Sequence, residues 1–241
     1  MLIRLDKLIA DSVNATRSGA RELIRAGRVR VNNVVCKKPD EKIDADFGEI
    51  RLDDQPVLYR RNLYLMMNKP EGYVSSTEDP REKTVLELLP EELQKRGLFP
   101  AGRLDKDAEG FLLLTNDGAF AHSVISPKRH VDKVYFITVS APLSEADQKA
   151  FADGVVLSDG TLCRPAGLEI IPGTNGLAGR VTLREGKYHQ VKRMTASRGK
   201  TVLSLKRISI GGVLLDDALL PGEWRFLTQT EEKKLKTTEI L

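Results

Sequence analysis

The chain is poor in cysteine: Cys36 and Cys163 are its two thiols, and they lie far apart without a C-x-x-C spacing. A disulfide framework or a zinc ribbon is therefore not expected, and a reducing compartment fits this composition. Long hydrophobic runs are also missing, since no stretch approaches the roughly 18 apolar residues of a membrane span. The N-terminal M-L-I-R-L-D-K-L carries charges where a signal peptide needs an apolar core. We expect a cytoplasmic protein that does not enter a membrane.

The motifs of several large enzyme classes are absent as well. The three histidines, His122, His130 and His189, are scattered, and no cysteine accompanies them at metal-ligand spacing. No G-x-G-x-x-G, G-x-x-x-x-G-K-[ST] or G-x-S-x-G occurs. We therefore expect neither a metal nor a cofactor, and any chemistry must use side chains alone. A pair of carboxylates, as glycosidases use, stays open because Asp107 and Glu109 are close to Asp105.

The composition otherwise describes a globular protein with a mildly basic charge. Of the 241 residues, 41% are hydrophobic and 30% are charged, with a net charge of +4. This balance supports a packed core and permits a polyanionic partner without requiring one. A polar stretch from Asp53 to Asn62, which contains Pro56, predicts a linker. We divide the chain into residues 1–58 and 59–241.

The first segment concentrates arginines on two consecutive elements. Leu5, Leu8 and Ile9 have helical spacing, and a second helix is predicted between an N-cap at Thr16 and a stop at Gly27. The following R-V-R-V-N-N-V-V predicts a strand, a tight turn at two asparagines and a second strand. Five arginines then gather into one basic surface suited to phosphate: Arg17, Arg21 and Arg25 on one side of the helix, and Arg28 and Arg30 on one face of the strand.

The second segment predicts more strands than helices, without regular alternation. This favours an α+β fold with a mixed, mostly antiparallel sheet. The predicted strands are L-Y-L-M-M-N-K, F-L-L-L-T-N-D-G, K-V-Y-F-I-T-V-S, R-V-T-L-R-E-G and T-V-L-S-L-K-R-I-S-I-G-G; the predicted helices are P-E-E-L-Q-K-R, L-S-E-A-D-Q-K-A-F and Lys187 to Arg198, with T-E-E-K-K-L-K-T-T as an exposed final helix or frayed end.

Three pieces of this segment could carry chemistry. Asp105 lies in a loop, A-G-R-L-D-K-D-A-E-G, just before an apolar run, which is a usual way to present a reacting side chain. Lys133 and Tyr135 share one face of a strand. In E-G-K-Y-H-Q-V-K-R-M the basic residues His189, Lys192 and Arg193 would share one side of a helix.

The first segment resembles the RNA-binding domain named for ribosomal protein S4. The likeness rests on R-L-D-K-L-I-A followed by T-R-S-G-A-R-E-L-I-R-A-G-R-V-R-V-N, over roughly the first 55 residues. It implies a helix-helix-hairpin domain that grips RNA. The residues we expect to contact RNA are the five arginines above together with Arg4, Lys7, His189 and Arg193.

The second segment resembles the RsuA-type pseudouridine synthases, which modify ribosomal RNA. The likeness rests on G-R-L-D, K-V-Y, G-K-Y-H-Q-V-K-R-M and L-K-R-I-S-I-G-G in this order, with N-K-P-E-G-Y-V-S-S-T and S-P-K-R-H beside them. It implies an isomerase in which Asp105 is the essential residue, acting as a nucleophile or as a base. It also implies four substrate-binding residues: Lys192 beside Asp105, Tyr135 stacked on the target base, Leu205 as an apolar contact on the uracil, and Arg103 holding the flipped nucleotide.

We therefore expect a monomeric pseudouridine synthase that acts on 16S ribosomal RNA or an assembling small subunit. Phe111 departs from the pattern, because a smaller or aliphatic residue is expected after the loop glycine. Two alternatives stay open. One is a uridine of the large-subunit (23S) RNA, the target of the RluB and RluF members of the family. The other is a ribosome-assembly factor without turnover, against which an intact Asp105, Tyr135 and Lys192 argue.

Overall fold

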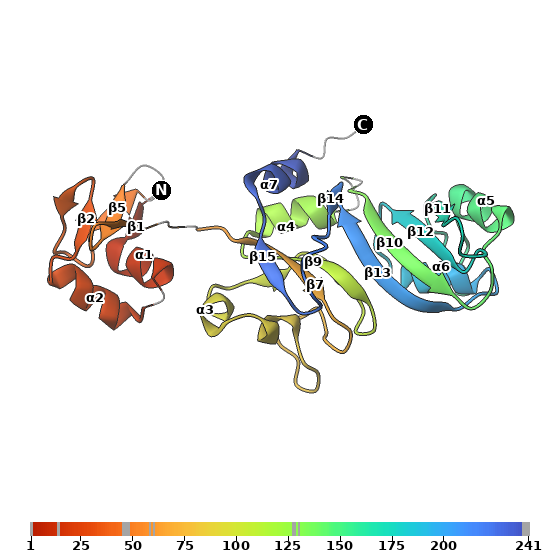
Figure 1. Ribbon diagram of the computed structural model, residues 1–241, viewed down its shortest axis with the longest axis horizontal. Helices are drawn as coiled ribbons and strands as arrows, with labels where there is room; N and C mark the ends of the chain where they lie inside the picture. The colour runs from red at the N-terminus through yellow and green to blue at the C-terminus, as the bar shows by residue number, and fades with distance from the viewer. Residues whose placement is uncertain are drawn as a thin grey trace. The chain divides into compact units, whose positions relative to one another are not determined.

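The computed structural model describes residues 2–13, 15–44, 49–57, 59, 61–126, 129 and 131–237. The chain divides into two compact units, Met1–Asn62 and Leu63–Leu241 (Figure 1). His130, named above among the scattered histidines, lies outside the described residues. Each unit has its own hydrophobic core, so each is described by itself.

The first unit contains two helices and two small antiparallel sheets. Leu5, Leu8 and Ile9 of α1 and Ala20 and Ile24 of α2 are fully buried against each other, which is the packing that their helical spacing predicts. The elements are β1 (Leu2–Arg4), α1 (Leu5–Ser12), α2 (Arg17–Arg25), β2 (Val29–Val31), β3 (Val34–Val35), β4 (Lys42–Asp44), β5 (Ile50–Leu52) and β6 (Gln55–Pro56), with β1 paired to β4 and the others in the order β3-β2-β5-β6.

The local signals of this unit are confirmed. The Thr16 side chain accepts a hydrogen bond from the Gly19 amide and caps α2. Gly27, with φ of +74°, follows the end of that helix. Asn32 and Asn33 have φ of 50° and 65°, the left-handed backbone that joins β2 to β3 in a tight hairpin.

The predicted linker is wrong in its first half. Gln55 and Pro56 form β6, which pairs with Leu52 and Arg51 of β5 and so belongs to the sheet of the first unit. Asp53 and Asp54, with φ of 50° and 61°, make the turn between these strands. Two adjacent aspartates tolerate this left-handed backbone and favour a hairpin turn. Their polar composition is also typical of a linker.

The second unit is built on one large sheet. Among its described residues the sheet has nine strands, in the order β11-β12-β10-β13-β9-β7-β15, with β14 paired to β13 and β8 to β9. The pairs are antiparallel except for β13 with β9, which run parallel. The α+β fold with a mixed, mostly antiparallel sheet is therefore confirmed. The strands are β7 (Tyr64–Lys69), β8 (Phe99–Pro100), β9 (Glu109–Thr115), β10 (Lys133–Val139), β11 (Gly167–Ile170), β12 (Ala178–Leu183), β13 (Val202–Ile210), β14 (Val213–Leu214) and β15 (Trp224–Phe226).

Two apolar clusters pack against the sheet, because successive side chains of its central strands enter different clusters. In β9, Leu112 and Leu114 enter one cluster, whereas Phe111 and Leu113 enter the other. Helices α4 and α7 lie side by side (Figure 1) and belong to the second cluster. The helices are η1 (Val85–Leu88), α3 (Glu91–Gln94), α4 (Gly118–Ile125), α5 (Glu145–Asp153), α6 (Gln190–Ala196) and α7 (Gln229–Lys236).

Two helices differ from expectation. Helix α4 is not predicted from the sequence, although Asp117 caps it by accepting a hydrogen bond from the Phe120 amide and although Phe120, Ala121 and Val124 are buried. The final helix α7 is not simply exposed, because Leu235 is fully buried in the second cluster. Within the ranges that the structure describes, none of the helices has the length and apolar character needed to cross a bilayer.

Candidate active site

Asp105 lies in the loop between β8 and β9. The preceding residue, Leu104, is buried in the core, and the Ala108 amide donates to the Asp105 carbonyl oxygen, so the loop is closed on itself. The Asp105 side chain keeps 26% of its surface exposed. A buried neighbour and a closed turn therefore hold a carboxylate at the protein surface, as the sequence predicts.

The loop backbone is held by Ser75 and Lys69, two buried residues that sequence reasoning did not single out. The Ser75 hydroxyl donates to the Leu104 carbonyl oxygen at 2.9 Å and accepts from the Leu104 amide at 3.0 Å. The Lys69 ammonium, at the end of β7, donates to the carbonyl oxygens of Ala108 at 2.7 Å and Pro70 at 3.0 Å, with Lys106 at 3.4 Å. Burial lowers the pKa of Lys69 to about 8, against the pull of nearby carboxylates that include Asp105.

Arg207 of β13 also holds this loop, from its other end. Its side chain is 2% exposed. Nε donates to the Phe111 carbonyl oxygen at 2.7 Å, and Nη1 lies 3.5 Å from the Arg103 carbonyl oxygen. Its Nη2 finds no hydrogen-bond partner among the described residues. The sequence L-K-R-I does not predict that its arginine is buried and bound to two backbone carbonyl oxygens.

Two basic side chains reach the Asp105 carboxylate. His189 Nε2 lies 3.5 Å from Asp105 Oδ1, and Lys192 Nζ lies 3.6 Å from Asp105 Oδ2. Lys192 also donates to Asp107 Oδ1 at 2.5 Å, and this hydrogen bond lowers the pKa of Asp107 although partial burial opposes the shift. The Asp105 carboxylate thus shares the Lys192 ammonium group with Asp107.

The helix α6 positions these groups. Gln190, Val191 and Met194 are buried, which turns Lys192 outward toward the Asp105 loop. His189 precedes the helix in a left-handed conformation, with φ of 48°. The predicted common side is confirmed for His189 and Lys192, which converge on Asp105. Arg193, the third residue of that set, pairs with Asp159 and not with Asp105.

Tyr135 and Leu205 lie on neighbouring strands, β10 and β13, within the same apolar cluster as Leu104. Both are buried, at 8% and 7% exposure. The Arg207 guanidinium lies 5.9 Å from the centre of the Tyr135 ring. Lys133 shares a face of β10 with Tyr135, as predicted, and it is buried. Arg103 is exposed in the Asp105 loop.

Phe111 does not crowd the Asp105 loop. It is fully buried in the second cluster, whereas Leu104 belongs to the first. This departure from the family pattern therefore lies in a different apolar cluster from the one that contains Leu104.

In the first unit, most of the basic residues named above are already paired. Arg4, Arg17 and Arg21 all contact Asp6, which is fully buried. Their hydrogen bonds, that of Arg4 above all, overcome the cost of burial and hold the Asp6 pKa well below its usual range. The hairpin arginines pair with the turn aspartates, Arg28 with Asp53 and Arg30 with Asp54; Lys7 and Arg25 are exposed.

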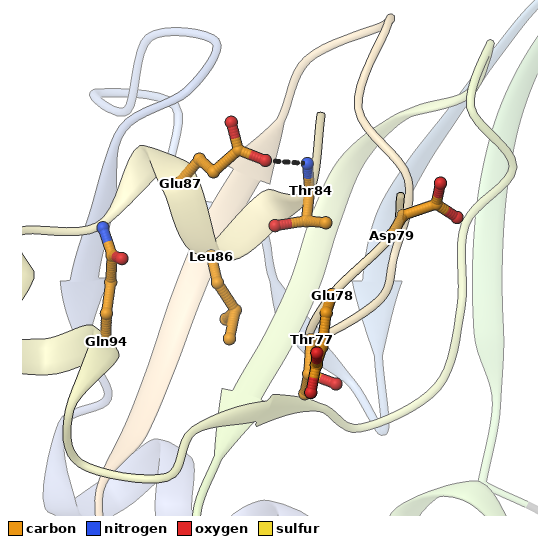
Figure 2. Close-up of a pocket in the computed structure, with 7 residues that line it drawn as sticks. All are labelled: Thr77, Glu78, Asp79, Thr84, Leu86, Glu87 and Gln94. Carbon is orange, nitrogen blue, oxygen red and sulfur yellow. Dashed lines mark hydrogen bonds between the residues drawn. The ribbon is translucent and has the colours of Figure 1, made fainter. Parts of the chain in front are cut away.

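A separate pocket of about 340 Å³ lies near η1 (Figure 2). Three carboxylates, Glu78, Asp79 and Glu87, surround Leu86 there, and none of the lining residues is basic. The Thr84 amide donates to Glu87 at 2.7 Å (Figure 2). This lining does not suit a polyanion. Within the described part of the chain, no group of three histidine, cysteine, aspartate or glutamate side chains could hold a metal ion.

Comparison with known proteins identifies the family. The model of the RNA pseudouridylate synthase family matches residues 63–197, and that of the S4 domain matches residues 3–46. An uncharacterized RNA pseudouridine synthase of Bacillus subtilis (strain 168) is 46% identical over 230 residues, 95% of this chain and 96% of the relative. Ribosomal small subunit pseudouridine synthase A of Escherichia coli (strain K12) is 41% identical, over 95% of this chain and 98% of the relative.

A crystal structure of a pseudouridylate synthase superimposes with a TM-score of 0.68 and 40% identity, covering 97% of this chain and 99% of that one. The sequence matches extend over both units, and the Asp105 loop lies within the matched range. The chain therefore belongs to the RNA pseudouridine synthases, as an RsuA-like isomerase with an N-terminal S4 domain.

Proposed function

We propose that this enzyme converts one uridine of small-subunit (16S) ribosomal RNA to pseudouridine and that Asp105 performs the chemistry. The observation that carries the proposal is the Asp105 carboxylate itself: it is partly exposed, its loop is braced from both ends, and His189 and Lys192 lie within 3.6 Å of it. The 16S target is supported by the 41% identity to ribosomal small subunit pseudouridine synthase A.

The reaction breaks the bond between ribose C1′ and uracil N1, turns the base and joins C1′ to C5. The proton on C5 is lost and N1 gains one, so atoms balance without a cofactor. An ionised carboxylate serves this in one of two ways, by attacking ribose or base as a nucleophile or by removing a ribose proton. Lys192 and His189 lie beside the Asp105 carboxylate and hold it in place before the substrate binds.

The other site residues take the roles that the family resemblance implies. Tyr135 stacks on the uracil, and Leu205 forms the apolar contact beside it; their places on adjacent strands of one cluster support this. Arg103, exposed in the Asp105 loop, holds the flipped nucleotide. Arg193 reaches RNA only by giving up Asp159.

Residues 1–58 grip RNA and residues 59–241 carry the catalytic site. The match to the S4 domain and the cationic side chains of α2 and β2 support the first role. Most of these arginines are paired with carboxylates, so each must exchange its carboxylate for an RNA phosphate. Lys7 and Arg25 are exposed and bind phosphate most readily. The enzyme acts as a monomer.

A pseudouridine map tests the proposal. Unmodified 16S and 23S ribosomal RNA are incubated with the enzyme, with Asp105→Asn or with Asp107→Asn, and mapped by carbodiimide-based primer extension. We expect one new signal in 16S RNA, lost with Asp105→Asn and retained with Asp107→Asn, a matched control from the same loop that also contacts Lys192.

Each other result corrects a defined part. A signal in 23S RNA alone keeps the chemistry and changes the target. An unaltered signal with Asp105→Asn removes Asp105 from the reaction. No signal in either RNA overturns ribosomal RNA as the substrate.

A further inference from the structure

Tyr188 is the most exposed large apolar side chain near Asp105. It lies in the turn before α6 and keeps 75% of its surface exposed. Its ring stacks on that of the next residue, His189, with centroids 3.8 Å apart and planes 17° from parallel. His189 in turn contacts Asp105. The stacked rings of His189 and Tyr188 therefore contact the Asp105 carboxylate on the His189 side and leave the Tyr188 ring exposed on the other.

The backbone is strained where this stack is made. Adjacent side chains normally diverge, and the left-handed conformation of His189 brings the two rings parallel. A residue with a side chain rarely adopts this conformation, and such strain is concentrated at functional sites. Hydrogen bonds within the turn hold this strained conformation in place. Gln190 accepts a hydrogen bond from the Lys187 amide and donates to Glu185, and Arg193 donates to the Tyr188 carbonyl oxygen.

The charges around the ring fit a nucleic acid. Lys187, Lys192 and Arg193 belong to the same turn and helix as Tyr188, and each would have to exchange a carboxylate, Glu185, Asp107 or Asp159, for phosphate. Arg103 is exposed in the Asp105 loop. Cationic side chains that follow a backbone, combined with an exposed aromatic face, are what single-stranded RNA requires. A flipped uridine leaves its neighbours unstacked, so a planar surface beside the site would replace the lost stacking.

We propose that Tyr188 is a platform on which a nucleobase adjacent to the target uridine stacks. The inference rests on the proposed function of the Asp105 site, since that site defines where the uridine lies. The occupant is a base in single-stranded conformation, and the ring plane of Tyr188, rather than its hydroxyl group, binds it.

The test compares Tyr188→Phe, which keeps the ring, with Tyr188→Leu, which keeps apolar bulk without a plane. Steady-state rates are measured on a short RNA that contains the mapped uridine. A base–aromatic stack of ordinary strength predicts a roughly 5- to 150-fold loss of kcat/KM for Tyr188→Leu, mainly through KM, and little change for Tyr188→Phe. Leu214→Ala, at an exposed leucine of β14, is the control and should match wild type.

A second comparison separates stacking from folding. Each nucleotide beside the uridine is replaced in turn by an abasic one. At the stacked position, wild type should lose as much as Tyr188→Leu has lost, and Tyr188→Leu should lose nothing more. Equal losses for both proteins at every position, or a Tyr188→Leu rate equal to wild type, would overturn the proposal.

Failure of the proposed function has its own signature. If Asp105→Asn is as active as wild type, or if no ribosomal RNA is modified, the function is wrong, and Tyr188 is then tested by binding. A fluorescent single-stranded 12-mer RNA and its abasic analogue serve as probes, with fluorescence anisotropy as the readout. Stacking predicts that Tyr188→Leu weakens binding of the normal strand only; equal binding of both strands by all variants refutes it.

Discussion

Gly110 of β9 and Arg207 of β13 pair so closely that a Cβ on Gly110 would lie 2.3 Å from the Arg207 carbonyl oxygen. Gly110 also has φ of +100°, a conformation that side chains rarely adopt. This contact is where the parallel pairing of the two strands begins and where the Asp105 loop ends. Close backbone approach, rather than flexibility, explains the glycine.

Gly110→Ala should therefore destabilise the second unit. The left-handed strain costs about 1–2 kcal/mol and the overpacking about 1–3 kcal/mol, which together give roughly 2–5 kcal/mol. Urea unfolding followed by Trp224 fluorescence measures this. Gly72→Ala is the matched control, because Gly72 also has positive φ but a Cβ there meets nothing within 4 Å; only the strain should appear. Equal losses for the two variants would show that the β13 contact is not tight.

Lys69 and Lys133 should titrate near pH 8. Burial lowers the pKa of both from 10.5 to about 8; Arg207 adds to the effect at Lys133, and the carboxylates of the Asp105 loop oppose it at Lys69. NMR of lysine labelled with ¹³C at Cε measures the midpoints, and Lys69→Arg and Lys133→Arg assign the signals. Midpoints near 10.5 would contradict the burial.

The lowered pKa values of Lys69 and Lys133 determine the direction in which the free energy of unfolding changes with pH. Between about pH 8 and 10.5 the unfolded chain binds more protons at these lysines than the folded chain, so unfolding becomes harder as the pH rises. A depression from 10.5 to about 8 limits the gain to about 3 kcal/mol for each lysine, at 1.36 kcal/mol per pH unit. Urea unfolding at pH 8 and pH 10 should show the rise in wild type, and a smaller one in a variant that lacks either lysine.

Asp147 should stabilise the second unit fully above about pH 4 and progressively less below it. Burial opposes its ionisation, but hydrogen bonds from Lys200, Ser144 and Arg198 outweigh burial and hold its pKa well below the usual range. The contribution is complete above the unfolded pKa and declines as the pH falls toward the folded pKa. Asp147→Asn should cost about 3 kcal/mol at pH 7 and about 1 kcal/mol less at pH 3, at 1.36 kcal/mol per pH unit below the unfolded pKa.

The sequence contains one tryptophan, Trp224, which lies in the second unit and reports this transition. Asp6→Asn is the control: it removes a comparable buried carboxylate from the first unit and should leave the Trp224 transition unchanged. An Asp147→Asn deficit of the same size at both pH values would mean that ionisation of Asp147 is not its source.

Asp53→Asn should strengthen RNA binding. Arg28 is paired with Asp53 in the exposed turn of the first unit, and asparagine tolerates the same left-handed backbone. The change frees a guanidinium and removes a negative charge, which predicts a roughly 2- to 5-fold gain in affinity at low salt. The gain should shrink as salt is added. Fluorescence anisotropy with 16S RNA fragments measures both, and Asp11→Asn, a charge change on α1, is the control. A gain that persists at high salt would contradict the electrostatic origin.

Local patterns predicted most of the fold because its signals are local. Thr16, Asn32–Asn33 and the alternating burial of Lys133, Tyr135 and Ile137 follow from capping, turn chemistry and strand period. The sequence does not predict α4, because its N-cap, Asp117, and its first residue, Gly118, close the run F-L-L-L-T-N-D-G, which favours a strand. The linker was misplaced because two aspartates in a hairpin have the composition of a loop.

The candidate site was predictable only in part. Asp105 and Lys192 belong to recognisable motifs, and the structure brings them together. The loop is held by Ser75, Lys69 and Arg207, which come from segments distant in sequence. They bind backbone carbonyl oxygens, and because every residue has one, the sequence does not predict these contacts. Ion pairs are equally hard to predict, because the sequence does not show that Arg4, Arg17 and Arg21 all contact Asp6.

The strand order of the second unit governs when a nascent chain can become active. Neither β9 nor β7 has its full set of neighbours until much later segments are synthesised, because β13 pairs with β9 and β15 pairs with β7. The Asp105 loop thus emerges long before Arg207, which holds it, and the sheet closes only once Phe226 is available. Such non-local pairing slows folding. A chain cut short before β13 would contain the Asp105 motif but would lack the strand that arranges it.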